Sequence, residues 1–234
     1  MGDDNDNVWK SVSFYDKSTG QSPRYPRQLI AGKYVICAAV DDSAGMFLGH
    51  MCWGRNEYGQ LGIGNTATDV GITLAMQPVI EAYWFLPPAE RCTHISTYMY
   101  HTCCVRGVVG QVRCWGNNAD GQLGYDDLQQ RGHTQASMLN LGDIQMGHDV
   151  SKNHAVRVCV GEKHSCAIFQ NGNLKCWGSN ADKQLGGDAS RLAPLAQFLV
   201  FPYSGEITEI ACNEKSTAVV TSTGETWWWG DFER

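Results

Sequence analysis

Three copies of one eleven-residue pattern recur along this chain and limit what it can fold into. The copies read CWGRNEYGQLG at 52–62, CWGNNADGQLG at 114–124 and CWGSNADKQLG at 176–186. Their tryptophans are each 62 residues apart, and a fourth Trp-Gly follows 52 residues after the third. Self-similarity at such a period is typical of folds built from stacked supersecondary units, such as solenoids and propellers.

The residues before each Trp-Gly predict a β-hairpin. In the third copy, Cys166 and Ile168 precede Gly172, and Leu174 and Cys176 follow it. This alternation around an Asn-Gly pair indicates two antiparallel strands joined by a tight turn. If Gly172 takes the left-handed position of a three-residue turn, Cys166 lies opposite Cys176.

The segment after each Trp-Gly supplies turn residues and a leucine. The asparagine and the glycines of Asn-x-x-Gly-Gln-Leu-Gly favour turns and positive φ angles. The leucine is expected to plug into the core. The recurring residues of the motif are Trp53, Trp115, Trp177, Trp229, Gln60, Leu61, Gln122, Leu123, Gln184 and Leu185.

With these motifs the chain resembles the regulator of chromosome condensation repeat family. That family shares a Gly-x-x-His-Ser/Thr-x-Ala strand, a hairpin, a Trp-Gly and an Asn-x-x-Gly-Gln-Leu-Gly turn. The resemblance extends from Gln28 to Gly230, with Val35 and Ser216 standing where His101 and His164 occur. It implies an all-β propeller.

The repeats divide the chain into about four propeller blades. An N-terminal segment, 1–27, precedes a propeller domain, 28–234, with repeats at about 28–90, 91–154 and 155–204 and a half repeat at 205–234. The resemblance implies rings of seven blades, and the repeats of this chain are too few to form such a ring. Residues 8–15 are expected to supply the missing strands and close a short ring. The alternative is an open partial propeller, completed by a partner or a second copy.

Six of the ten cysteines fall at two positions of the repeat. Because the spacing recurs, we expect cross-strand disulfides, which favour an oxidising compartment, lumenal or secreted. The alternative is reduced, buried cysteines in a cytosolic protein. Cys159 and Cys212 occupy nearly equivalent inner-strand positions in neighbouring repeats. The predicted disulfide pairs are Cys37 with Cys52, Cys103 with Cys114, and Cys166 with Cys176.

Candidate chemistry at these positions is weak. Cys159, His164 and Cys166 lie close together in sequence, but no C-x-x-C pair occurs, and strand alternation would send them to different faces. A catalytic Cys-His pair would not recur in successive blades. We therefore expect no metal, no cofactor and no catalytic residue. His101 and His164 are expected to hydrogen-bond neighbouring backbone within their own hairpins.

Composition excludes two classes of partner. The net charge is −6, and Asp3, Asp4 and Asp6 open the chain without a basic residue, which argues against nucleic acid. No apolar run approaches the roughly 18 to 20 residues that a membrane-spanning helix needs, so direct membrane insertion is not expected. The first residues, MGDDNDNVWK, lack a secretory signal pattern.

Two aromatic segments are candidates for contact with other proteins. The connection 82–88, AYWFLPP, departs from the other repeats and carries Tyr83, Trp84 and Phe85. Trp229 matches the repeat tryptophan and is expected in the core, and Trp228 occupies the position of Cys176, which leaves Trp227 available for binding. Exposed aromatic residues on propeller connections are favoured anchors for partners.

These observations favour a non-catalytic propeller that binds other proteins, as a scaffold or a structural subunit of a larger complex. Two alternatives stay open. The family resemblance raises guanine-nucleotide exchange on a small GTPase. The paired cysteines and aromatic connections raise an extracellular or lumenal ligand-binding propeller.

Overall fold

The computed structural model describes residues 25–66, 79–80, 92–107, 110–147, 153–187 and 205–231. The first sheet contains β1 (Tyr25–Ala31), β2 (Val35–Asp41), β3 (Phe47–Gly54) and β4 (Val79–Ile80). The second contains β5 (Cys92–Thr97), β6 (His101–Arg106) and β7 (Gln111–Gly116). The third contains β8 (Ala155–Val160), β9 (His164–Phe169) and β10 (Leu174–Gly178), and the fourth β11 (Ile207–Cys212), β12 (Ser216–Thr221) and β13 (Thr226–Gly230).

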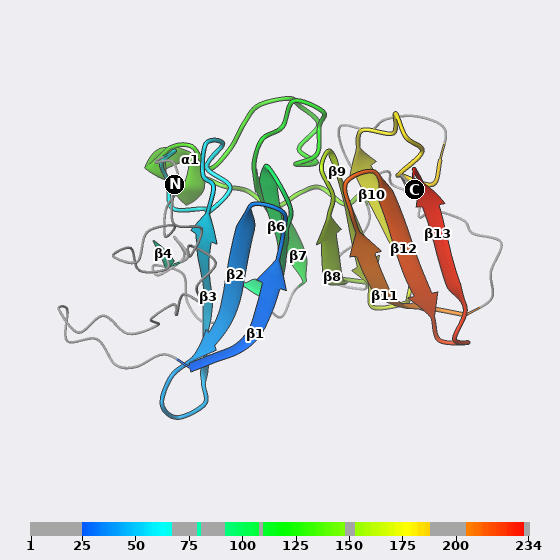
Figure 1. Ribbon diagram of the computed structural model, residues 1–234, viewed down its shortest axis with the longest axis horizontal. Helices are drawn as coiled ribbons and strands as arrows, with labels where there is room; N and C mark the ends of the chain where they lie inside the picture. The colour runs from blue at the N-terminus through cyan, green and yellow to red at the C-terminus, as the bar shows by residue number, and fades with distance from the viewer. Residues whose placement is uncertain are drawn as a thin grey trace, which may run out of the picture.

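The four sheets are propeller blades, one for each repeat, so the prediction of an all-β fold with about four blades is correct. They follow one another in chain order as separate sheets in an open arrangement (Figure 1). One five-residue helix, α1 (Gln135–Leu139), capped by Thr134, follows the second blade. β1 begins at Tyr25, slightly before the predicted start of the repeats. Residues 8–15, expected to close the ring, lie outside the described residues.

The hairpins have the register that the sequence predicts. Cys166 pairs with Cys176 across β9 and β10, and Leu174 pairs with Ile168. Gly172 has a φ of 72°, in the left-handed region that glycine tolerates best. Among the described residues, no helix is long and apolar enough to cross a membrane.

The Asn-x-x-Gly-Gln-Leu-Gly turn is held by its own side chains. Asn118 Oδ1 accepts from the backbone N–H of Leu123 at 2.9 Å, and Gln122 Oε1 accepts from that of Asp120 at 2.9 Å. The turns of the first and third blades repeat both bonds. Lys183 takes a φ of 65° where the other two turns have glycine. This bonding fixes the turn so that the following leucine is buried; these leucines are Leu61, Leu123 and Leu185.

The glutamine carbonyl of each turn joins one blade to the next. Gln122 O accepts from Trp177 Nε1 at 3.0 Å and from Ser165 Oγ at 2.9 Å, both in the third blade. The same pair of bonds recurs at the other two junctions. Gln60 O accepts from Trp115 Nε1 and Thr102 Oγ1, and Gln184 O accepts from Trp229 Nε1 and Thr217 Oγ1.

Two buried histidines also form hydrogen bonds between neighbouring blades. The expectation that they bond backbone in their own hairpins is therefore wrong. His101 Nε2 lies 2.8 Å from Ser165 Oγ, and His164 Nε2 lies 2.9 Å from Thr217 Oγ1. Because each hydroxyl donates to a glutamine carbonyl, the histidine Nε2 donates its N–H to that hydroxyl. Burial lowers the pKa of His101 to about 3 and that of His164 to about 4. The expectation was wrong because the partners lie in the next blade, which the sequence of one hairpin does not reveal.

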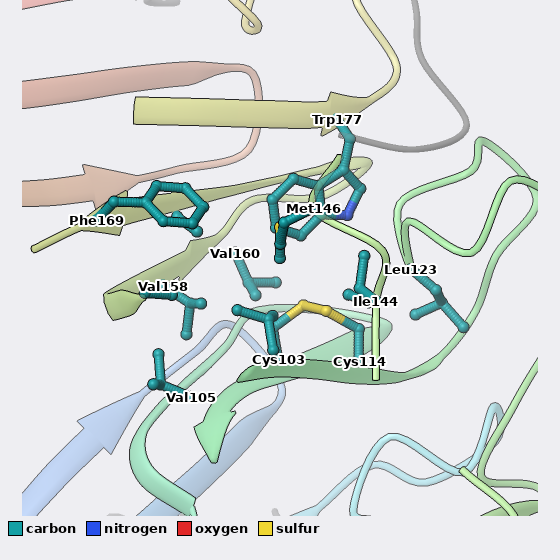
Figure 2. Packing of buried hydrophobic residues seen from close by; sticks show 13 residues of the cluster. Cys103, Val105, Cys114, Leu123, Ile144, Met146, Val158, Val160, Phe169 and Trp177 are labelled. Carbon is teal, nitrogen blue, oxygen red and sulfur yellow. A yellow bond between two sulfur atoms is a disulfide. The ribbon is translucent and has the colours of Figure 1, made fainter. Parts of the chain in front are cut away.

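Apolar side chains fill the space between neighbouring blades. Between the second and third blades, the Cys103–Cys114 disulfide faces Val158, Val160 and Trp177 (Figure 2). A similar buried cluster lies between the first and second blades, and another between the third and fourth. The core is therefore a series of layers between blades, and each turn leucine belongs to one of them.

All ten cysteines form disulfides. Three bonds join the middle and outer strands of one blade at the recurring positions: Cys37–Cys52, Cys103–Cys114 and Cys166–Cys176. Cys92–Cys104 joins β5 to β6. Cys159–Cys212 joins the third blade to the fourth across 53 residues, which is worth roughly 4 kcal/mol in the chain-entropy treatment. The sulfurs of Cys159, Cys166 and Cys212 lie within 4.8 Å of one another, whereas His164 bonds elsewhere.

The disulfide pattern predicts the behaviour of the native protein toward alkylating agents. Without reduction, no cysteine should be labelled, because every thiol is consumed. Mass spectrometry of a non-reduced digest should recover the peptides of Cys159 and Cys212 joined to each other. Labelling of both residues in the native protein would contradict the covalent link between the blades.

Removing one donor from a glutamine carbonyl should destabilise the fold. Trp177→Phe deletes the indole N–H that Gln122 O accepts, inside a buried layer. We expect the free energy of unfolding to fall by about 2 kcal/mol, measured by denaturant unfolding with disulfides intact. Trp228→Phe is the matched control: this side chain is 62% exposed, and a change within about 0.5 kcal/mol is expected. Equal losses would contradict the junction's role.

The neutral histidines make stability depend on pH. His50 and His94 join His101 and His164, since burial lowers the pKa of each to about 4. Below the ordinary pKa of about 6.5 the unfolded chain binds more protons than the native one. The contribution of these histidines to the free energy of unfolding is therefore fully present above pH 6.5. It falls toward pH 4, by up to ~1.4 kcal/mol per pH unit for each histidine. Urea unfolding across this range should show a shallower slope for His164→Gln, and an unchanged slope would contradict the assignment.

Candidate functional site

Two kinds of loop lie at the same end of the molecule. The first and third strands of an antiparallel blade run in the same direction, so the loop after the first strand and the turn after the third share an end. This end, the upper one in Figure 1, is called the turn end, and the opposite one the hairpin end. The loops that connect the first two strands are called first loops, and they comprise 32–34, 98–100, 161–163 and 213–215.

The first loops of distant blades meet at the turn end. Lys33 Nζ lies 2.9 Å from Glu214 Oε2, joining the first blade to the fourth across 181 residues of sequence. The hydrogen bond to Glu214 raises the pKa of Lys33. The backbone N–H of Glu162 donates to Glu214 O at 3.2 Å, and that of Tyr34 donates to Tyr98 O at 3.4 Å. All four blades therefore contribute to one surface.

Four tyrosines gather on this surface. The rings of Tyr58 and Tyr100 meet edge to face with centroids 5.4 Å apart, and Tyr34 lies 6.4 Å from Tyr100. Tyr98, whose carbonyl bonds Tyr34, completes the group. All four are half-buried, and within the described residues none of their hydroxyls makes a hydrogen bond. We call Tyr34, Tyr58, Tyr98 and Tyr100 the tyrosine face.

Charged residues surround the tyrosine face. The Arg55 guanidinium lies 4.2 Å from the centroid of Tyr34 and within 3.9 Å of the Glu57 carboxylate. Burial is the main cause that raises the pKa of Tyr98 and of Tyr100, and the half-buried Glu162 adds to both. Within the described residues, the carboxylate of Glu162 has no ion-pair or hydrogen-bond partner. The surface thus offers aromatic faces, hydroxyl groups and the Glu162 carboxylate.

Comparing the repeats at one position would have indicated this face. Tyr34 and Tyr100 occupy equivalent positions directly before Val35 and His101, while the third and fourth repeats have lysine there. Tyr98 stands where the first and third repeats have glycine.

The residues expected to contact partners lie elsewhere. Tyr83, Trp84 and Phe85 are outside the described residues. Trp227 is half-buried against the cluster between the third and fourth blades, together with Trp229. The motif glutamines and leucines lie at the blade junctions, as do Trp115, Trp177 and Trp229. Trp53 instead packs against residues of the first blade.

The geometry defines a class of protein: a β-propeller repeat protein whose loops form a shared surface at one end. Residues 155–184 match the model of the regulator of chromosome condensation (RCC1) repeat. Over these residues the chain is therefore similar to the RCC1 repeat.

Related sequences and structures agree with this assignment. The probable E3 ubiquitin-protein ligase HERC4 of Homo sapiens is 29% identical over 181 residues, covering 76% of this chain and 15% of the ligase. The mitochondrial RCC1 domain-containing protein RUG3 of Arabidopsis thaliana is 24% identical, covering 83% of this chain and 40% of its own length.

Two solved structures share the fold. A structure of Kap60 bound to yeast RCC1 (Prp20) superposes with a TM-score of 0.65 at 18% identity, covering 94% of this chain and 45% of that one. Human WBSCR16 superposes with a TM-score of 0.63 at 20% identity, covering 89% of this chain and 48% of that one. The chain thus spans less than half the length of each of these relatives.

Proposed function

We propose that this chain is a non-catalytic module that binds another protein through its turn end, as a scaffold or structural subunit. The observation that carries the proposal is the tyrosine face, with four half-buried rings whose hydroxyls make no hydrogen bond within the described residues. Tyrosine contributes a large, rigid contact area and a polar group, so it is enriched at the centres of protein interfaces. A surface of this composition suits a protein partner.

The residues considered for chemistry are engaged in structural contacts, which supports a non-catalytic role. His101 and His164 bond hydroxyls of the next blade, and the cysteines are joined in disulfides. The same contacts recur from junction to junction, as expected of architecture.

Structural relatives support a protein partner. One is yeast RCC1 (Prp20) with Kap60 bound, and another is Prp20p of Saccharomyces cerevisiae, described with its binding properties to Gsp1p and histones. These are properties of those proteins. The exchange-factor and ligand-binding alternatives stay hypotheses that no contact among the described residues favours over protein binding.

Photo-cross-linking tests which end of the molecule docks. A photoreactive residue at Glu57, on the rim of the tyrosine face, should cross-link a discrete partner in extracts of the source cell. The same residue at Glu225, on the β12–β13 turn at the hairpin end, should not. Tyr100→Ala should reduce the Glu57 adduct. Adducts from position 225 alone, or a Glu57 adduct unaffected by Tyr100→Ala, would contradict the proposal.

A further inference from the structure

We infer that the tyrosine face binds a basic segment of its partner, with a lysine or arginine side chain placed against Tyr98 and Tyr100 and paired with Glu162. The inference rests on the proposed function and specifies the chemistry of the partner at that surface.

Some charged side chains on this surface already have partners within the chain, and others do not. Both cations that border the tyrosines already have partners: Lys33 is paired with Glu214, and Arg55 lies over Tyr34 and beside Glu57. Within the described residues, Glu162 has no such partner. Glu162 acts on both Tyr98 and Tyr100, so the charge nearest these two rings that is left to attract a ligand is a carboxylate, which complements a cation.

The rings themselves are suited to cations. Tyr34 already carries Arg55 at 4.2 Å and Lys33 at 5.9 Å from its centroid, within the distance of a cation–π contact. Among the described residues, no cation lies over Tyr58, Tyr98 or Tyr100. Each of these rings could make the cation–π contact that Tyr34 makes, with a cation that the partner supplies.

The adjacent Lys163 does not reverse the preference of the tyrosine face for a cationic ligand. It is exposed and follows Glu162 in the same first loop. After burial, Glu162 is a cause that raises the pKa of both tyrosines, and the cation that lowers the pKa of Tyr98 is the paired Lys33 and not Lys163. An acidic segment would face the Glu162 carboxylate at close range, which is unfavourable.

Peptide titrations test the inference on the full, disulfide-bonded chain. The probe is a fluorescent twelve-residue peptide that alternates Lys or Arg with Gly or Ser, and its twin carries Glu in place of the cations. Fluorescence anisotropy should show binding of the basic peptide, weakened by added salt, and no comparable binding of the acidic twin.

Matched variants locate the binding. Glu162→Lys should weaken the basic peptide about fivefold or more, and Tyr100→Ala roughly 30-fold. Tyr100→Phe, which keeps the ring, should restore most of the affinity. Glu225→Lys makes the same charge change at the hairpin end and should leave binding within about twofold. Absence of binding by the basic peptide, tighter binding of the acidic twin, or equal losses in Glu162→Lys and Glu225→Lys would overturn the inference.

The partner cross-link separates this inference from the proposed function. If Tyr100→Ala abolishes the Glu57 adduct but Glu162→Lys does not change it, a protein still docks at the tyrosine face and the basic chemistry is wrong. If both variants abolish the adduct and the basic peptide competes with it, the inference is supported.

Discussion

The carbonyl oxygen of the motif glutamine is the interaction on which the rest of the structure depends. It emerges from a turn held by its own asparagine and glutamine side chains, and it accepts both an indole N–H and a hydroxyl from the next blade. A buried carbonyl left without donors would cost free energy, so each blade needs its neighbour at a defined distance and angle. The same residues recur at three junctions, which sets a regular progression of blades.

That progression determines where the loops go. Because consecutive blades are related by the same contacts, the first loops of all four come together at the turn end. The Lys33–Glu214 ion pair and the Cys159–Cys212 disulfide connect blades that the strand ladders leave separate. The tyrosine face is a product of this convergence, since its members come from two blades and the neighbouring Glu162 carboxylate from a third.

Features within a single hairpin could be predicted from the sequence, whereas features between blades could not. The glycine at 172 was enough to fix the register of β9 and β10, because turn geometry acts locally. The partner of His101 was predicted wrongly, because Ser165 lies 64 residues away in the next blade. The tyrosine face likewise joins loops of two different blades, and only equivalent positions in the repeats, such as Tyr34 and Tyr100, hint at it.

The central claim is that blade stacking brings the first loops of the first and fourth blades together at one end. Zero-length carbodiimide cross-linking tests it, since this reagent joins an amine directly to a carboxylate in contact with it. In the monomeric fraction, mass spectrometry should find an amide between Lys33 and Glu214, whose side chains lie 2.9 Å apart. A monomer that yields no such amide, although Lys33 reacts readily with an amine reagent, would contradict the account.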